Sequence, residues 1–250
     1  MQNELVDFSL LIPPLLAGLL VLATHVPLGV RVLARGIVFI DLAVAQAAAL
    51  GVIAAGLLGW PQHGWAMQAA AAASALIAAG LLLQAEKRWP QQQEALIGTL
   101  FVLAASAGML LLARDPHGSE HLQDLLAGQI LWLNFSQLLP AALVTALLLI
   151  LLHYARGRFE ATGFYFLLAV SVTLSVQLVG VYLVFASLII PALAVRPGQK
   201  NGLLKAYFIG AAGYALGLVF SALSDLPAGA IIIWCMAGVA MPMIFMRNKG

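Results

Sequence analysis

Eight long apolar runs follow one another along this chain and leave little room for anything else. A helix that crosses a bilayer needs about 20 mostly apolar residues, and each run has about that length. Only 9% of the 250 residues are charged, whereas a soluble domain carries about a quarter. We therefore predict an all-α polytopic membrane protein with a single transmembrane domain over residues 1–250. The runs cover residues 8–30, 36–59, 65–85, 95–113, 136–155, 162–180, 203–222 and 228–246.

A ninth apolar run, residues 181–195, is too short to be a full span. It contains Pro191, which lacks a backbone donor and is expected to break the helix. Irregular backbone is tolerated at membrane depth where it is buried in protein or lines a cavity. We therefore expect eight long helices and one short helix that returns from the outer to the inner side.

Basic residues gather in alternate connections between the runs. Membrane proteins keep Lys and Arg in their cytoplasmic loops. If residues 181–195 return from outside and the C-terminus is cytoplasmic, only Arg114 falls outside. We predict an external N-terminus and, because no basic residue precedes the first run, a first span rather than a cleaved signal peptide. The basic residues placed inside are Arg31, Arg35, Lys87, Arg88, Arg156, Arg158, Arg196, Lys200, Lys205, Arg247 and Lys249.

Asp41 is an ionisable residue within a predicted span, about one turn or more into the second run. Charged groups inside a membrane are costly and are functional candidates. Gln46 follows five residues later, so the two side chains project about 140° apart and are poor partners for one ion. Two interpretations stay open: Asp41 pairs with Arg31 or Arg35, or it lines a permeation path.

Histidines occur near the predicted inner ends of two runs, His25 in the first and His153 in the fifth. A lone histidine at such a boundary commonly makes hydrogen bonds at the membrane interface. We expect that role for both.

The connection 114–124 is the most polar predicted outer segment. Carboxylates and imidazoles are ligands for a first-row divalent metal such as zinc. One interpretation is an acceptor site or a docking surface for a metal carrier, and the other is a solvated loop with an amphipathic helix. The candidate ligands are His117, Glu120, His121 and Asp124.

The segment after Pro191 is basic and carries Arg196, Lys200 and Lys205. On the cytoplasmic side, such a loop can contact a soluble partner, so we interpret it as the place where a transport path is coupled to that partner. A secondary transporter or channel would not need these three residues, and a purely structural membrane protein is a further alternative.

Motifs for nucleotide binding and hydrolysis are missing from the chain. It has no Gly-Lys-Ser/Thr phosphate loop, no His-Glu-x-x-His and no Gly-x-Ser-x-Gly, and Cys235 is its one cysteine. These three motifs are typical of ATP binding, zinc-dependent hydrolysis and acyl transfer, respectively. We therefore expect a transport subunit that is not an enzyme and binds no cofactor.

Five stretches carry recognisable motifs in a fixed order: 30–51, 94–101, 124–131, 177–192 and 225–229. The most specific is 177–192, which is similar to Gln-x-Val-Gly-x-Leu-Leu-Val-x-x-Leu-Leu-x-x-Pro-Ala. Together they resemble the permease subunits of bacterial ABC importers for zinc, manganese and iron. The resemblance covers nearly the whole chain.

This resemblance implies the type II architecture of the vitamin B12 importer, in the bacterial inner membrane. It implies a homodimeric or paired permease with two cytoplasmic ATP-binding subunits docked on the loop after Pro191. A periplasmic metal-binding protein would dock on the outer face, including residues 115–132. Lipid surrounds such a permease, and no nucleic acid is involved.

The second span departs from the family pattern Gly-Asp-x-Leu-x-His-x-x-x-Pro-Gly, whose Asp and His resemble metal ligands in the pathway. When Gly51 is aligned, Gln46 replaces the His, Leu42 replaces the Asp, and Asp41 stands one residue early. Asp41 and Gln46 are the pathway candidates. We expect zinc as cargo, with manganese or iron as alternatives, and a metal complex or other small nutrient as a rival.

Overall fold

The computed structural model describes residues 8–61, 65–113, 115, 118–128, 130–154, 162–195 and 201–247. Ten α-helices occur in these residues, with short 3-10 segments at Phe8–Leu11 (η1), Pro90–Gln92 (η2) and Ile130–Trp132 (η3), and no strand. The α-helices are α1 (Ile12–Arg35), α2 (Ile40–Leu57), α3 (Trp65–Arg88), α4 (Gln93–Leu112), α5 (Gly118–Ala127), α6 (Phe135–Tyr154), α7 (Thr162–Val179), α8 (Val181–Leu193), α9 (Gly202–Ser224) and α10 (Ala228–Arg247).

The all-α membrane fold predicted from the apolar runs is confirmed. Eight helices of the described chain are long and apolar enough to cross a membrane, and α8 is the short apolar helix between the sixth and seventh of them. The first helix extends five residues beyond the predicted run. It ends at Arg35 because Gly36 adopts a left-handed conformation with φ of 71° and donates its N–H back to the last turn, a common way to close a helix.

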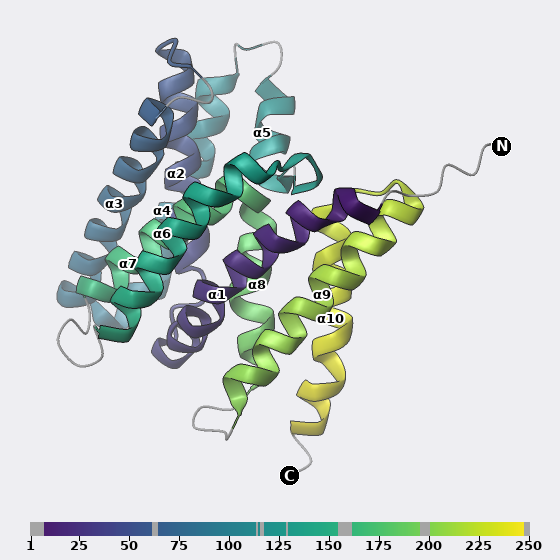
Figure 1. The fold of residues 1–250 in the computed structure, drawn as a ribbon. Coiled ribbons are helices and arrows are strands. Elements are labelled where there is room, and N and C mark those ends of the chain that lie inside the picture. The colour runs from purple at the N-terminus through teal and green to yellow at the C-terminus, as the bar shows by residue number, and fades with distance from the viewer. Residues whose placement is uncertain are drawn as a thin grey trace.

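The short helix α8 lies near the centre of the bundle (Figure 1). It contacts α1, α9 and α10 on one side and α2, α5 and α7 on the other. The C-terminal ends of α1, α3 and α10 and the N-terminal end of α9 lie at one end of the bundle, opposite α5 (Figure 1). These ends carry Arg35, Arg88, Arg247 and Lys205, so basic residues gather at a single end of the bundle.

The prediction that Pro191 breaks the short helix is wrong. Pro191 lies inside α8, which continues to Leu193. The helix is interrupted at Gly180, where the predicted runs 162–180 and 181–195 meet, and its φ of 82° and ψ of 163° separate α7 from α8. Gly180 donates its N–H to Val176 and accepts from Val184, so its own backbone N–H and carbonyl stay hydrogen-bonded where the chain changes direction.

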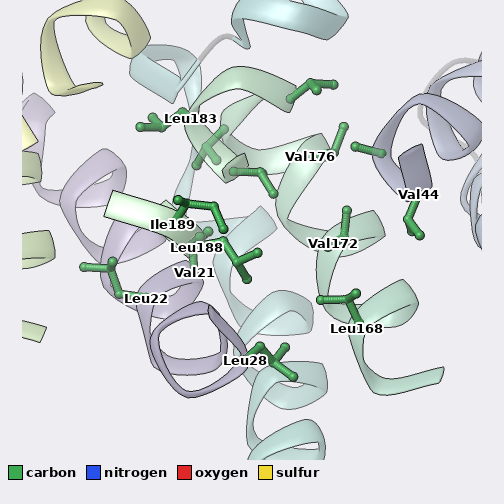
Figure 2. Packing of buried hydrophobic residues seen from close by; sticks show 14 of the residues in the cluster. Val21, Leu22, Leu28, Val44, Leu168, Val172, Val176, Leu183, Leu188 and Ile189 are labelled. Carbon is green, nitrogen blue, oxygen red and sulfur yellow. The ribbon is translucent and has the colours of Figure 1, made fainter. Parts of the chain in front are cut away.

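Close packing holds one face of α8 in the core. A Cβ on Gly29 of α1 would overlap the carbonyl oxygen of Leu188, and Ser187 shares a 2.9 Å hydrogen bond with Tyr214 of α9. Small residues allow membrane helices to approach this closely. Figure 2 shows the apolar side chains around this contact, including Val21, Leu22, Leu188 and Ile189, with Leu168, Val172 and Val176 spaced along α7.

We expect Gly180→Ala to destabilise the fold by about 1–3 kcal/mol, because an L-residue is strained at this positive φ. The added methyl would also overlap backbone atoms of Gly128, which follows α5. Gly98→Ala is the matched control, since nothing lies within 4 Å of a Cβ there. Thermal unfolding of both variants in detergent measures the difference, and equal melting temperatures would contradict the Gly128–Gly180 contact.

Candidate functional site

Two cavities follow one another along α8. The first, of about 390 Å³, lies where α5, η3 and the start of α10 meet, and we call it the α5-side cavity. The second, of about 460 Å³, lies between α8, α2, α4 and α10, and we call it the central cavity. Both are lined in part by Tyr182 and Ile233, so they adjoin one another at this pair.

The central cavity follows one face of α8 over nine residues. Tyr182, Phe185, Ala186 and Ile190 line it, at the spacing that places side chains on one helical face. Nine residues of helix rise about 13 Å, a large part of the apolar thickness of a bilayer. The two cavities thus follow one another from the α5 end of the bundle to the last turn of α8, and they share Tyr182 and Ile233.

Gln46 is placed at the central cavity. It lies in the second turn of α2, and its amide lines the cavity together with Leu42 of the preceding turn. Met109 of α4 also lines the cavity. The described lining is otherwise largely apolar, so Gln46 and Tyr182 are its main hydrogen-bonding side chains.

Asp41 is buried but lies on a different face of α2. It is the second residue of that helix, not a turn or more into it, because α2 begins only at Ile40. The side chain is 1% exposed, and neither carboxylate oxygen has a hydrogen-bond partner among the residues that the structure describes. The expected separation of Asp41 from Gln46 agrees with this geometry, since only Gln46 lines the cavity.

The interpretation that Asp41 pairs with Arg31 or Arg35 is wrong. Arg35 instead forms a 3.4 Å ion pair with Glu86 of α3, and its guanidinium lies 4.5 Å from the ring centre of Phe164. As the last residue of α1, Arg35 reaches sideways to α3 and α7 instead of toward α2. A buried carboxylate without a partner is rare enough to indicate a function.

A second carboxylate, that of Glu94 in the first turn of α4, lies beside the start of α2. One oxygen accepts the backbone N–H of Phe39 at 3.4 Å, and its other oxygen is buried without a partner among the described residues. Glu94 begins the motif 94–101, but the sequence alone indicated no role for it. Only the packing of α4 against α2 shows that it helps to begin α2.

His25 is not interfacial, contrary to expectation. It lies near the middle of α1 and is fully buried, because α1 extends to Arg35 and carries His25 deep into the bundle. Its Nδ1 lies 3.0 Å from the carbonyl oxygen of Val21, and neighbouring Thr24 accepts a 2.8 Å hydrogen bond from Ser171 of α7. His25 Nε2 has no partner in the described part of the chain.

The outer metal-ligand candidates stay predictions. Glu120 is exposed in the first turn of α5, whereas His117 and the side chains of His121 and Asp124 lie outside the described residues. Among the side chains that are described, no group of three or more His, Cys, Asp or Glu could hold a metal ion. The helix expected in this segment is present as α5.

The coupling residues also stay predictions. Lys205 is exposed in the first turn of α9, at the basic end of the bundle (Figure 1). Arg196 and Lys200 lie outside the described residues. The end of α8 leads directly toward this segment, which is the connection that the coupling interpretation requires.

The helical bundle and its apolar spans are those of a polytopic membrane protein. The chain belongs to the ABC 3 transport family, whose model matches residues 7–165 and 156–247. This confirms the resemblance drawn from the five motifs. The family is one of transport subunits rather than catalysts.

A curated relative and two solved structures are similar to this chain. The relative, "Probable metal transport system membrane protein" of Chlamydia muridarum (strain MoPn / Nigg), is 25% identical over 179 residues, which are 63% of this chain and 61% of that protein's length. The chain therefore matches less than two thirds of that relative.

The solved structures share the fold. PsaBC from Streptococcus pneumoniae in complex with Fab has a TM-score of 0.75 at 22% identity over 99% of this chain and 98% of that chain. A metal-chelate type ABC transporter in an inward-facing conformation has a TM-score of 0.68 at 19% identity, over 98% and 90% respectively. The predicted ABC permease architecture is thus confirmed.

Proposed function

We propose that this chain is the permease subunit of an ATP-driven importer for a divalent transition metal, with zinc as the first candidate and manganese or iron as alternatives. Membership of the ABC 3 transport family supports the ABC mode, and the name of the Chlamydia muridarum relative supports a metal. The observation that carries the proposal is Asp41, a buried carboxylate in a membrane-spanning helix, because neither of its oxygens has a partner among the described residues. A divalent cation supplies the missing partner for such oxygens.

Asp41 adjoins the proposed path. It directly precedes Leu42, which lines the central cavity one turn before Gln46. Gln46 lines the central cavity, whereas the Asp41 carboxylate is buried on another face of α2 and would act on a cation there through its charge. Asp41 and Gln46 are the residues to which we assign cargo binding in this span.

The proposed partners follow from the two ends of the bundle. A cytoplasmic ATP-binding subunit docks at the basic end, on the segment with Arg196, Lys200 and Lys205, and a periplasmic metal-binding protein docks at the α5 end. Two copies of the chain pair to form the permease. The protein lies in the bacterial inner membrane with the N-terminus outside and the C-terminus in the cytoplasm, as the positive-inside rule favours.

Uptake by cells tests the function. Radioactive zinc, manganese and iron are supplied to metal-starved cells that lack or overexpress the chain. We expect uptake of one metal, zinc first, to disappear without the gene and after ATP depletion. Unchanged uptake of all three metals would contradict the metal-importer proposal.

Alanine replacement of Arg196, Lys200 and Lys205 together should abolish co-purification of the ATP-binding subunit while the permease still inserts. The reason is that a cytoplasmic docking loop loses its charged contacts. Replacement of Arg247 is the control, since this residue ends α10 at the same end of the bundle but outside the docking segment. Full transport by the triple variant would favour a transporter that needs no ATPase.

A metal complex or other small nutrient is the second candidate cargo. The central cavity favours it in one respect: its volume of about 460 Å³ exceeds that of a single ion, and its described lining offers the neutral amide of Gln46. Amides are weak ligands for zinc beside imidazole or carboxylate. Competition between the free metal and its small organic chelates in the same uptake measurement separates the two cargoes.

A further inference from the structure

One face of α3 is exposed along the second half of the helix and ends in two positive charges. Ile77, Leu81, Gln84 and Arg88 recur at the spacing of a single helical face, and all four are exposed, as is Lys87 beside them. The helix packs on α2, α4 and α7 and lies at the edge of the bundle, away from α9 and α10 (Figure 1). It contributes no described residue to either cavity, so the proposed transport function does not use this face.

The acidic residue in the last turns of α3 points inward and has a partner. Glu86 lies two residues before Arg88, hence on the opposite side of the helix, and forms the 3.4 Å ion pair with Arg35. Lys87 and Arg88 make no ion pair with any residue that the structure describes, and the segment 89–92 contains no acidic residue. The end of α3 therefore presents two outward positive charges that the described chain does not neutralise.

A tryptophan follows these two cations directly. Trp89 donates its N–H to the carbonyl oxygen of Ala85 at 2.8 Å, which fixes its backbone to the last turn of α3, and its side chain is 51% exposed. Pro90 then begins η2 and ends the helix. Indole rings gather where the apolar core of a membrane meets the head groups. Trp89 therefore places Lys87 and Arg88 at the level of the head groups.

The exposed face below the cations is apolar and has free space beside it. Ile77 is 66% and Leu81 53% exposed, and a Cβ on Gly80, between them on the outer surface, would meet nothing within 4 Å. Seven residues separate Leu81 from Arg88, a rise of about 10 Å along the helix. A phosphate held at Arg88 would thus have an acyl chain running down beside Leu81.

We propose that the end of α3 binds an anionic phospholipid: Lys87 and Arg88 hold the phosphate of its head group, and its acyl chain lies along Leu81 and Ile77. The guanidinium of an arginine matches phosphate oxygens with two parallel hydrogen bonds, and basic residues beside a span attract anionic lipids. A lipid fits better than the ATP-binding subunit, because the cations end an apolar outward face at the edge of the bundle, away from α9. That this lipid belongs to the cytoplasmic leaflet rests on the proposed topology, whereas the binding itself does not.

Quenching of Trp89 fluorescence by brominated lipids tests this site. The full chain is reconstituted in vesicles of phosphatidylcholine and phosphatidylglycerol, with brominated acyl chains on one lipid or the other. The difference between the parent and Trp89→Phe isolates the quenching of this one indole. We expect phosphatidylglycerol to be preferred over phosphatidylcholine beside Trp89 by about thirtyfold, from two cations together, and the preference to fall as salt is raised.

Two double variants separate a specific site from a general effect of charge. Lys87→Gln with Arg88→Gln should reduce the preference to nearly one. Arg247→Gln with Lys249→Gln removes the same charge from the C-terminal segment and should keep the full preference. Lys87→Arg keeps the cation and should bind as the parent does.

Equal quenching by the two brominated lipids in the parent protein would overturn the proposal, as would an undiminished preference in the variant without both cations or an equal loss in the C-terminal variant. Removal of the preference by inorganic phosphate, but not by chloride at the same ionic strength, would assign the cations to free phosphate instead. Unchanged quenching in Lys87→Gln with Arg88→Gln, together with lost co-purification of the ATP-binding subunit, would make the surface a protein contact. Metal uptake is measured on the parent in the same vesicles with its partners, and absent uptake with a clear lipid preference would refute only the importer proposal.

Discussion

Gly29→Ala is expected to be the most damaging alanine substitution at any glycine in the described part of the chain. A Cβ at this position would come closer to another backbone atom, the carbonyl oxygen of Leu188, than a Cβ at any other described glycine. The methyl can be accommodated only by moving α1 away from α8. Overpacking of this kind costs about 1–3 kcal/mol or more, which outweighs the gain of up to about 1 kcal/mol from higher helix propensity.

Thermal unfolding in detergent measures this effect, with Gly80→Ala as the matched control. Gly80 also lies inside a long helix, but a Cβ there meets nothing within 4 Å. We expect Gly80→Ala to melt at or slightly above the parent temperature and Gly29→Ala to melt well below it. If both variants melted alike, α1 and α8 could not pack as described, and the positions of the cavities along α8 would be wrong as well.

Asp41→Leu is expected to stabilise the protein and to stop transport. A carboxyl group buried without a hydrogen-bond partner is costly, and replacement by an apolar side chain of similar size removes that cost, by about 1–3 kcal/mol. Cargo loses a charged contact of about 1.5–3 kcal/mol, so uptake should fall at least about tenfold. Opposite changes in stability and activity are typical of residues kept for function.

Zinc uptake and thermal unfolding on the same preparations check both halves of this prediction. Asp225→Asn is the control: this aspartate is exposed between α9 and α10 in a left-handed conformation with φ of 53°, which asparagine also adopts. We expect the control to leave uptake and melting unchanged. Reduced stability together with normal uptake in Asp41→Leu would assign Asp41 a structural role.

The long helices could be predicted from the sequence because bilayer thickness sets how many apolar residues a span needs. The predicted short run, 181–195, agrees with α8 to within two residues. The effect of Pro191 was predicted wrongly, because this proline is tolerated near the last turn of that helix. The close contact of Gly180 with Gly128, more than 50 residues earlier in the chain, could not be predicted. A contact between the backbones of two distant helices leaves no local pattern in the sequence except a glycine. A glycine in a membrane span can also occur for other reasons, so it does not identify such a contact.

The candidate site could likewise be predicted only in part. Helical geometry correctly separated Asp41 from Gln46, since that separation depends only on residue spacing within α2. The partner of Arg35 could not be chosen from the sequence, because Glu86 and Phe164 come near it only through packing of α1 against other helices. The position of Tyr182 and Ile233 at both cavities became visible only in the folded chain, because the two residues lie on different helices.

Metal transport by the purified system is the most direct test of the central claim. The chain is reconstituted into liposomes with its ATP-binding subunit and supplied with a metal-loaded binding protein, and radioactive zinc inside the liposomes is counted with and without ATP. We predict accumulation that requires ATP and disappears in Asp41→Leu. Accumulation that is independent of ATP, or none for zinc, manganese or iron in a complex that hydrolyses ATP, would contradict the assignment as a permease for divalent metals.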